Sequence, residues 1–183
     1  NGTISKLNFK NYTYKNIVAN GEYENNKFDG ALTIDDDNFK MQFDGLADLS
    51  SKINEFDFKT KIDYLDLKAT NLFTRDSIAK LKGNISLDIK GNNLDNITGD
   101  AIFKEVFYTN EKKEFVFDEF IVISSIKDSI KKIEVKSNDI AKGSISGKFL
   151  FEELPRVAQN ALGSIYTNYK PYKETDKPNP ESV

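Results

Sequence analysis

Short runs in which every second side chain is apolar recur along this chain from about residue 7 to residue 151. Lys, Asp, Asn and Ser fill many of the positions between them. The apolar positions, run by run, are Leu7/Phe9, Tyr12/Tyr14, Ile17/Ala19/Tyr23, Phe28/Leu32/Ile34, Phe39/Met41/Phe43, Phe56/Phe58/Ile62/Tyr64, Leu81/Ile85/Leu87/Ile89, Phe115/Phe117/Ile121/Ile123, Ile133/Val135 and Ile145/Phe149/Phe151. Because successive side chains of a β-strand point to opposite faces of a sheet, each run predicts a strand with one apolar and one polar face.

Turn-forming residues separate many of these runs. They are Asn20-Gly21, Asn25-Asn26-Lys27, Asp35-Asp36-Asp37-Asn38, Gly91-Asn92-Asn93 and Asn110-Glu111-Lys112-Lys113. Such short spacings leave no room for crossover helices, so successive strands must pair as hairpins. The sequence therefore predicts an all-β, mainly antiparallel sheet over residues 1–151. Between Leu65 and Lys80 the alternation fails, and we interpret that segment as a connection with one helical turn at 76–81.

The end of the chain has a different pattern. Leu154, Val157, Ala158, Ala161, Leu162 and Ile165 recur at spacings of three and one, which predicts an amphipathic helix over residues 152–167. Pro155 suits the first turn of this helix, and we expect its apolar stripe to cap one end of the sheet. Residues 168–183 contain three prolines and alternating charges, which is typical of a polar tail or linker.

Composition narrows the fold and the kinds of partner. Of the 183 residues, 38% are hydrophobic and 30% are charged, which fits a sheet with one face in water. The net charge is only −3 and the charges of both signs are interspersed, which argues against a nucleic-acid partner. The start of the chain lacks the features of a signal peptide, and no apolar stretch approaches the length of a membrane span. We interpret the chain as a piece, or the ordered part, of a larger protein.

Candidate chemistry is sparse. The chain has no Cys and no His, which removes the usual nucleophiles, bases and zinc ligands together. Asp35-Asp36-Asp37-Asn38 could bind calcium, but it lacks the ligand spacing of a calcium loop and suits a hairpin turn better. We therefore predict no catalytic residue, no metal site, no cofactor and no enzymatic activity.

Two triplets, Asp76-Ser77-Ile78 and Asp128-Ser129-Ile130, fall in predicted connections. They resemble a short motif that some Gram-negative bacteria O-glycosylate on envelope proteins, which makes Ser77 and Ser129 candidate acceptors. A pattern of three residues also arises by chance, and the sequence leaves both interpretations open.

Several longer blocks carry a resemblance to a known family. They are residues 39–49, 56–62, 64–67, 94–101 and 141–149, whose spacing and residue classes resemble recurring blocks of the large TamB and AsmA-like bacterial envelope proteins. The resemblance extends over most of residues 1–170. It implies a long bent sheet, or trough, of successive hairpins with an apolar concave face.

The same resemblance implies a function. Such proteins are thought to carry phospholipid acyl chains through the periplasm between the inner and outer membranes, anchored to the inner membrane by a segment absent from this chain. Some work with an outer-membrane β-barrel partner, and the resemblance extends to a role in assembling outer-membrane proteins. The side chains that would line the lipid groove are Leu32, Ile34, Met41, Phe43, Phe56, Phe58, Ile62, Ile85, Leu87, Ile89, Phe117, Ile145 and Phe149. The alternative is a dry two-sheet β-sandwich, as in a structural or adhesive cell-surface module.

Overall fold

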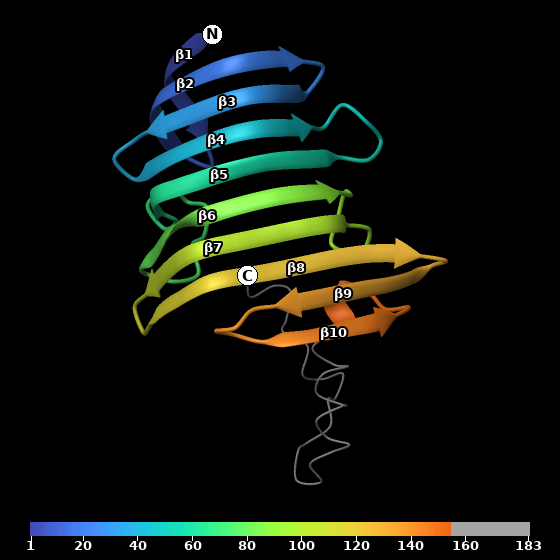
Figure 1. The fold of residues 1–183 in the computed structure, drawn as a ribbon. Coiled ribbons are helices and arrows are strands. Elements are labelled where there is room, and N and C mark those ends of the chain that lie inside the picture. Colours follow the sequence, from blue (N-terminus) through green and yellow to red (C-terminus); the bar gives the residue numbers. More distant parts are fainter. Residues whose placement is uncertain (155–183) are drawn as a thin grey trace. The chain divides into compact units, whose positions relative to one another are not determined.

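The structure, a computed structural model, describes residues 1–154 and divides the chain into two units, 1–146 and 147–183. The first unit is formed by one ten-stranded sheet, whose last strand ends at the boundary between the units (Figure 1). The strands are β1 (Gly2–Phe9), β2 (Tyr12–Glu24), β3 (Lys27–Asp35), β4 (Phe39–Asp48), β5 (Glu55–Asp66), β6 (Ala79–Lys90), β7 (Thr98–Asn110), β8 (Glu114–Lys127), β9 (Ile130–Lys136) and β10 (Lys142–Gly147).

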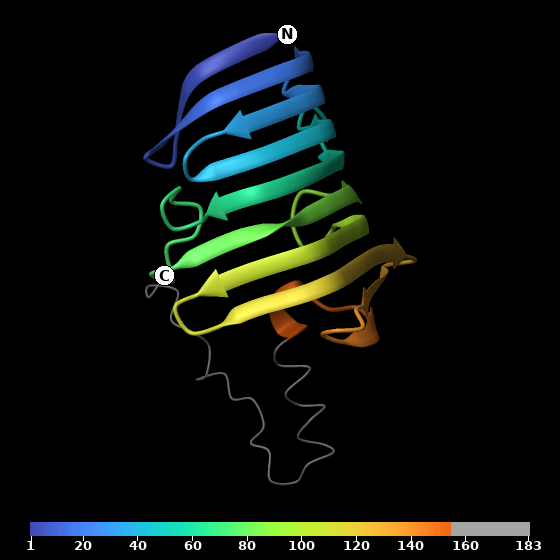
Figure 2. The same cartoon turned by 60° about the vertical axis from the view of Figure 1, so that its left-hand side comes forward.

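Each strand pairs with its neighbour in the sequence, from β1 to β10, as successive rungs (Figure 2). From β1 to β9 the pairing is antiparallel throughout. The prediction of an all-β antiparallel sheet of successive hairpins is confirmed. The described residues form one open sheet, so they do not form the two-sheet sandwich that was the alternative.

Tight turns set the register of several hairpins. Three of them place two consecutive non-glycine residues at positive φ: Lys10-Asn11, Asn25-Asn26 and Asp128-Ser129. Positive φ at both central residues is the requirement of a type I′ turn, whose twist matches that of the flanking strands. The turns predicted at Asn25-Asn26-Lys27, Asp35–Asn38, 91–93 and 110–113 all fall where one strand ends and the next begins, and they overlap the strand ends at Lys27, Asp35 and Asn110.

Other local predictions were wrong. Asn20-Gly21 lies inside β2, where Gly21 pairs with Gly30. Strand β2 also joins the predicted runs Tyr12/Tyr14 and Ile17/Ala19/Tyr23 in one strand. The helical turn predicted at 76–81 is absent: residues 76–78 lie in the connection between β5 and β6, and residues 79–81 begin β6, where Lys80 and Leu81 join the ladder to β5. Strand β7 matched no predicted run, since its apolar side chains lie on both faces of the sheet.

Two glycines have a steric role in the sheet. Gly30 and Gly45, which pair with each other, have φ of 151° and 135°. A Cβ added at Gly45 would lie 2.3 Å from the carbonyl oxygen of Asp57, and one added at Gly30 would lie 2.4 Å from that of Asn20. Only glycine allows the neighbouring backbones to approach this closely. The ladders on both sides of β3 show no bulge at Gly30.

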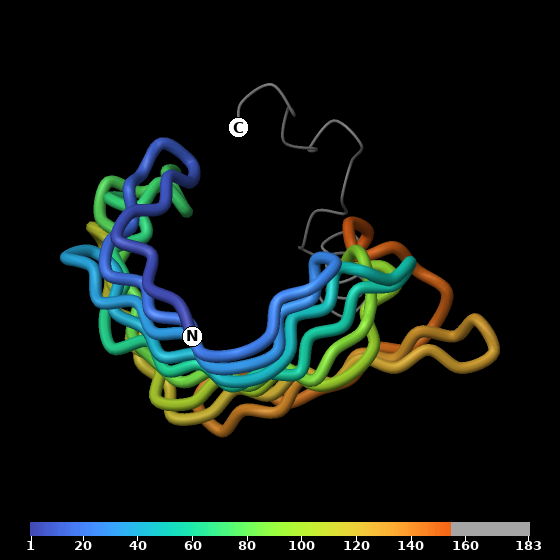
Figure 3. Tube along the Cα trace, turned by 90° about the horizontal axis from the view of Figure 1, so that it is seen from above, coloured from blue at the N-terminus to red at the C-terminus, as the bar shows by residue number. Residues whose placement is uncertain are grey.

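Viewed from above, the strands of the first unit lie over one another, and each is strongly bent along its own length (Figure 3). In the second unit the structure describes a short 3-10 helix, Phe151–Glu153. The predicted helix at 152–167 and the predicted tail at 168–183 lie, apart from residues 152–154, outside the described residues. No helix within residues 1–154 is long and apolar enough to cross a membrane.

Candidate functional site

The strand pairing gathers the apolar side chains on one face of the sheet. In an antiparallel ladder, directly paired residues project to the same face, so the pairings can be followed from strand to strand. Leu32 pairs with Phe43, Phe43 with Thr60, Thr60 with Ile85, and Ile85 with Phe103. The intervening positions of β3, such as Lys27, Asp29 and Asp35, are exposed on the opposite face. We name the first of these surfaces the apolar face.

Eleven of the thirteen predicted groove residues lie on this face by their pairing: Leu32, Ile34, Met41, Phe43, Phe56, Phe58, Ile62, Ile85, Leu87, Ile89 and Phe117. Ile145 lies in β10 and is half-buried. Phe149 follows the end of β10, in the second unit, so the strand predicted to carry it ends too early. The polar exceptions on the face include Thr60, Ser124 and Lys131.

One end of the apolar face is covered by the connection between β5 and β6, residues 67–78, which we name the strap. The Tyr14 hydroxyl donates to the Thr70 carbonyl at 3.4 Å, and the Tyr108 hydroxyl donates to the Asp76 carboxylate at 3.1 Å. These tyrosines stand on β2 and β7, with four strands between them. Because both project from the apolar face, the strap lies across that face.

The side chains at this covered end are buried. Thr70 and Ala79 have no exposed surface, and Ile17 is only 2% exposed. The other buried apolar residues here are Tyr14, Ile34, Ile62, Leu65 and Val106. Burial raises the pKa of Tyr14 and of Tyr108, and the neighbouring Asp76 raises that of Tyr108 further. This end therefore holds the hydrophobic core of the unit.

The other end of the apolar face is open. There the ring of Phe43 lies between the rings of Phe28 and Phe58, with centroid distances of 6.0 and 4.8 Å, and Phe56 lies 6.4 Å from Phe58. All four rings, together with Leu87 and Ile89 on the next strand, are half-buried. Tyr23, at the edge of the same end, is 72% exposed. Aromatic and aliphatic side chains thus form a continuous surface that water still reaches.

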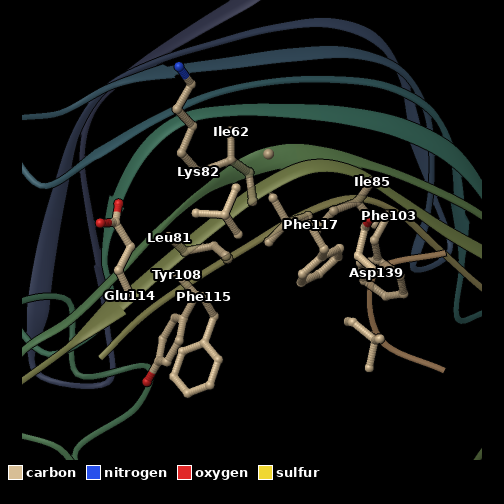
Figure 4. A pocket seen from close by; sticks show the side chains of 14 residues that line it. Ile62, Leu81, Lys82, Ile85, Phe103, Tyr108, Glu114, Phe115, Phe117 and Asp139 are labelled. Atoms are coloured by element: carbon tan, nitrogen blue, oxygen red, sulfur yellow. The ribbon is translucent and has the colours of Figure 1, made fainter. Parts of the chain in front are cut away.

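A pocket of about 830 Å³ lies on the apolar face over β5, β6, β7 and β8. Its apolar lining includes Ile62, Leu81, Ile85, Phe103, Val106, Tyr108, Phe115 and Phe117. Figure 4 shows labelled apolar side chains of this lining, such as Leu81, Phe103 and Phe117, on one side of the bent strands, with Lys82 pointing to the other side. We name this the β5–β8 pocket. Its volume falls within the range of about 300–1,000 Å³ that small-molecule sites occupy.

Several pocket residues were missed by the sequence analysis. Phe103, Val106 and Tyr108 stand on β7, the strand that was not predicted. Glu105 has a φ of 51°, and the apolar-face residues on either side of it, Phe103 and Val106, are three positions apart. Such a bulge shifts the alternation by one residue. Allowing for the bulge would have placed Phe103, Val106 and Tyr108 on one face, but Ile102 and Phe107 on the other face would still have obscured the alternation.

The Asp35–Asn38 cluster serves its turn. The carboxylate of Asp36, which is 1% exposed, accepts hydrogen bonds from the Tyr12 hydroxyl, the Asn38 amide at 2.9 Å and the Lys15 amide at 3.1 Å. Asp35 pairs with Lys40 at 2.9 Å. These bonds are those expected of a turn, which was the favoured interpretation. Among residues 1–154, no group of three or more acidic side chains converges on a point where a metal could bind.

The two candidate glycosylation serines are both exposed. Ser77 lies in the strap, and Ser129 is the second residue of the tight turn between β8 and β9. No family model, curated protein or solved structure matches this chain.

Proposed function

We propose that residues 1–146 form a segment of a lipid conduit, in which the apolar face is concave and shields phospholipid acyl chains. We place this segment in the periplasm between the inner and outer membranes, as part of a larger protein anchored to the inner membrane. Parts of that protein outside this chain would meet an outer-membrane β-barrel and would aid outer-membrane protein assembly. The observation that carries the proposal is the half-buried apolar surface at the open end of the sheet.

The two ends of the apolar face differ in what covers them. At the covered end the strap removes the apolar side chains from water, whereas at the open end no second sheet of the described residues does so. Burying hydrocarbon is favourable by about 0.8 kcal/mol for each methylene. An acyl chain lying against Phe43, Phe58 and Leu87 would therefore gain binding free energy for every methylene that it places there.

The bend of the sheet supports a chain-shaped ligand. A sheet that curves around its apolar face surrounds a narrow ligand on more than one side, and the charged residues of the other face stay in water. The orientation of Lys82, away from the apolar lining of the β5–β8 pocket, agrees with this arrangement (Figure 4). An adhesive sandwich would need a second sheet against the apolar face, so we favour the conduit.

Photo-crosslinking tests this proposal directly. A photoreactive phenylalanine analogue at Phe58, on the apolar face, should crosslink to phospholipid in cells that make the full protein. The matched control is the same analogue at Lys59, the next residue of β5, whose side chain projects to the opposite face. Equal crosslinking at both positions, or none at Phe58, would contradict the conduit. Mass spectrometry of co-purified lipids would identify the crosslinked class.

Substitutions at the open end separate transport from folding. Phe58→Glu and Leu87→Glu place a carboxylate on the proposed lipid path at positions where water can still reach it. We expect both variants to fold, with a loss of about 1–2 kcal/mol, and to disturb the lipid balance of the envelope. Outright unfolding of both, with no lipid recoverable from the unsubstituted protein, would show that this end is a packed core.

A further inference from the structure

We infer that the β5–β8 pocket is a seat for the end of one hydrocarbon tail, with Tyr108 as its end wall. The inference rests on the proposed function and adds to it. A conduit needs only a continuous apolar surface, whereas a seat with a wall retains a tail and selects among tail lengths.

The direction of the seat follows from the strands that form it. Phe103, Val106 and Tyr108 follow one another along β7 on the apolar face, and Phe117 and Phe115 accompany them on β8. A tail in the pocket can therefore lie along these two strands, from Phe103 towards Tyr108. Across the strands, Ile62 and Ile85 extend the apolar lining.

The strap makes Tyr108 a wall. The Tyr108 hydroxyl donates to Asp76 of the strap at 3.1 Å, and its ring lies 6.0 Å from that of Phe115. The strap is tied to the end of β5, because the Thr70 amide and hydroxyl both donate to the Asp66 carbonyl, at 3.0 and 2.7 Å. It is fixed a second time at Tyr14, through the bond to Thr70. A tail that grows towards Tyr108 thus meets a ring held at its hydroxyl by a compact turn.

The connection between β9 and β10 borders the pocket on another side. Ile140, which is 56% exposed, and Asp139 both line the pocket. The connection is bound to β8, since Asp139 accepts from the Asp118 amide at 2.8 Å and the buried Ser137 donates to the Glu119 carbonyl at 2.6 Å. Ile140 therefore presents an apolar side chain to the pocket from a fixed backbone.

The chemistry of the lining identifies the occupant as an uncharged hydrocarbon. Three charged residues border the pocket. The side chains of Lys82 and Glu114 point away from the apolar cluster (Figure 4), and the Asp139 carboxylate accepts a backbone hydrogen bond. The remaining surface offers rings and methyl groups with no counter-ion for a charged ligand. A saturated tail meets these requirements, and its head group would remain outside the pocket.

The test uses lysophospholipids that share one head group and differ only in tail length, titrated calorimetrically below their micelle concentrations. For the unsubstituted protein we expect the affinity to rise about fourfold per methylene and then to stop rising at one tail length. In Tyr108→Ala, the rise should continue to longer tails. Phe107→Ala removes an exposed ring from the opposite face of the same strand. It should leave unchanged the tail length at which the affinity stops rising, which we call the break.

Further variants keep the test decisive. Tyr108→Phe retains the ring but not the bond to Asp76, so the break should become less sharp. Should Tyr108→Ala fail to fold, Asp76→Ala releases the ring from the strap side and should move the break in the same direction. An affinity that rises without a break in the unsubstituted protein, or a break that no variant moves, would overturn the seat. Crosslinking at Phe58 without any calorimetric binding would overturn the seat but leave the conduit intact, whereas the absence of both would overturn both.

Discussion

The covered end and the open end of the apolar face begin from the same sequence pattern and differ in what lies over them. Ile17, Ile34 and Leu65 at the covered end are each no more than 9% exposed, and Tyr14, which clusters with Ile17 and Ile34, is bonded to the strap. Phe43, Phe58 and Leu87 at the open end have equally regular pairing and remain half-buried. Alternation therefore determines which face a side chain joins, and a distant segment determines whether that side chain becomes core.

Truncation of one leucine at each end should give the largest contrast. Leu65→Ala, at a site only 4% exposed, should lower the free energy of unfolding by about 2–4 kcal/mol, because a cavity remains in a packed region. Leu87→Ala, on the adjacent strand at the open end, should cost about 1 kcal/mol or less. Urea unfolding of both variants measures the difference. Equal losses would mean that the two ends are equally packed.

Adding a methyl group at Gly45, which pairs with Gly30, tests whether close backbone approach stabilises the open end. Gly45→Ala places a Cβ against the Asp57 carbonyl at a φ of 135°, and should cost about 1–3 kcal/mol. The matched control is Gly143→Ala, because no atom lies within 4 Å of the added Cβ. Hydrogen exchange of β3, β4 and β5 amides should accelerate in the first variant alone. Protection at the covered end should change least, since the strap still covers it.

The smallest expected effect concerns the attachment of the strap. Tyr14→Phe removes the hydroxyl that donates to Thr70 and should cost about 0.5–1.5 kcal/mol. Tyr23→Phe, at an exposed edge, should be nearly neutral. Thermal unfolding can rank the two variants. If Tyr23→Phe proves the more costly, the strap is not what distinguishes the two ends.

The same hydroxyl predicts a dependence on pH. Burial raises the pKa of Tyr14 in the folded state above its ordinary value of 10.0, so the unfolded chain loses this proton first as the pH rises. The contribution to stability is complete below pH 10.0 and is lost as the pH rises through the folded-state pKa. Tyr14→Phe should therefore lose less stability than the unsubstituted protein between neutral and strongly alkaline pH.

Much of the sheet could be predicted because its information is local. Ladders between neighbouring hairpins depend on period-two runs and on turn residues such as Asn25-Asn26, and both are visible in the sequence. Strand β7 was not predicted, because Ile102 and Phe107 place apolar groups on the polar face. In addition, the bulge at Glu105 shifts the alternation of apolar and polar positions by one residue. Asn20-Gly21 was wrongly predicted as a turn, because the sequence alone does not distinguish a glycine that a strand requires from a glycine in a turn.

The candidate site was only half predictable. Its apolar face follows from the alternation, and eleven of the thirteen proposed residues stand on it. The strap could not be foreseen, because Leu67, Leu72 and Phe73 follow no period. Its anchor joins Tyr14 to Thr70, which are 56 residues apart. Which part of a one-faced sheet becomes core is decided by such long-range contacts, and no single run of residues contains them.

The neighbour-only order of the strands, from β1 to β10, has a consequence for how such a molecule can change in length. Inserting or deleting one hairpin shifts the sheet by two strand spacings, about 9–10 Å, and restores both the chain direction and the face that each later strand presents. Only the two strands that flank the change take a new partner, and every other pair of the ladder is kept. Duplication of hairpins would therefore lengthen the sheet without changing which side chains its apolar face presents.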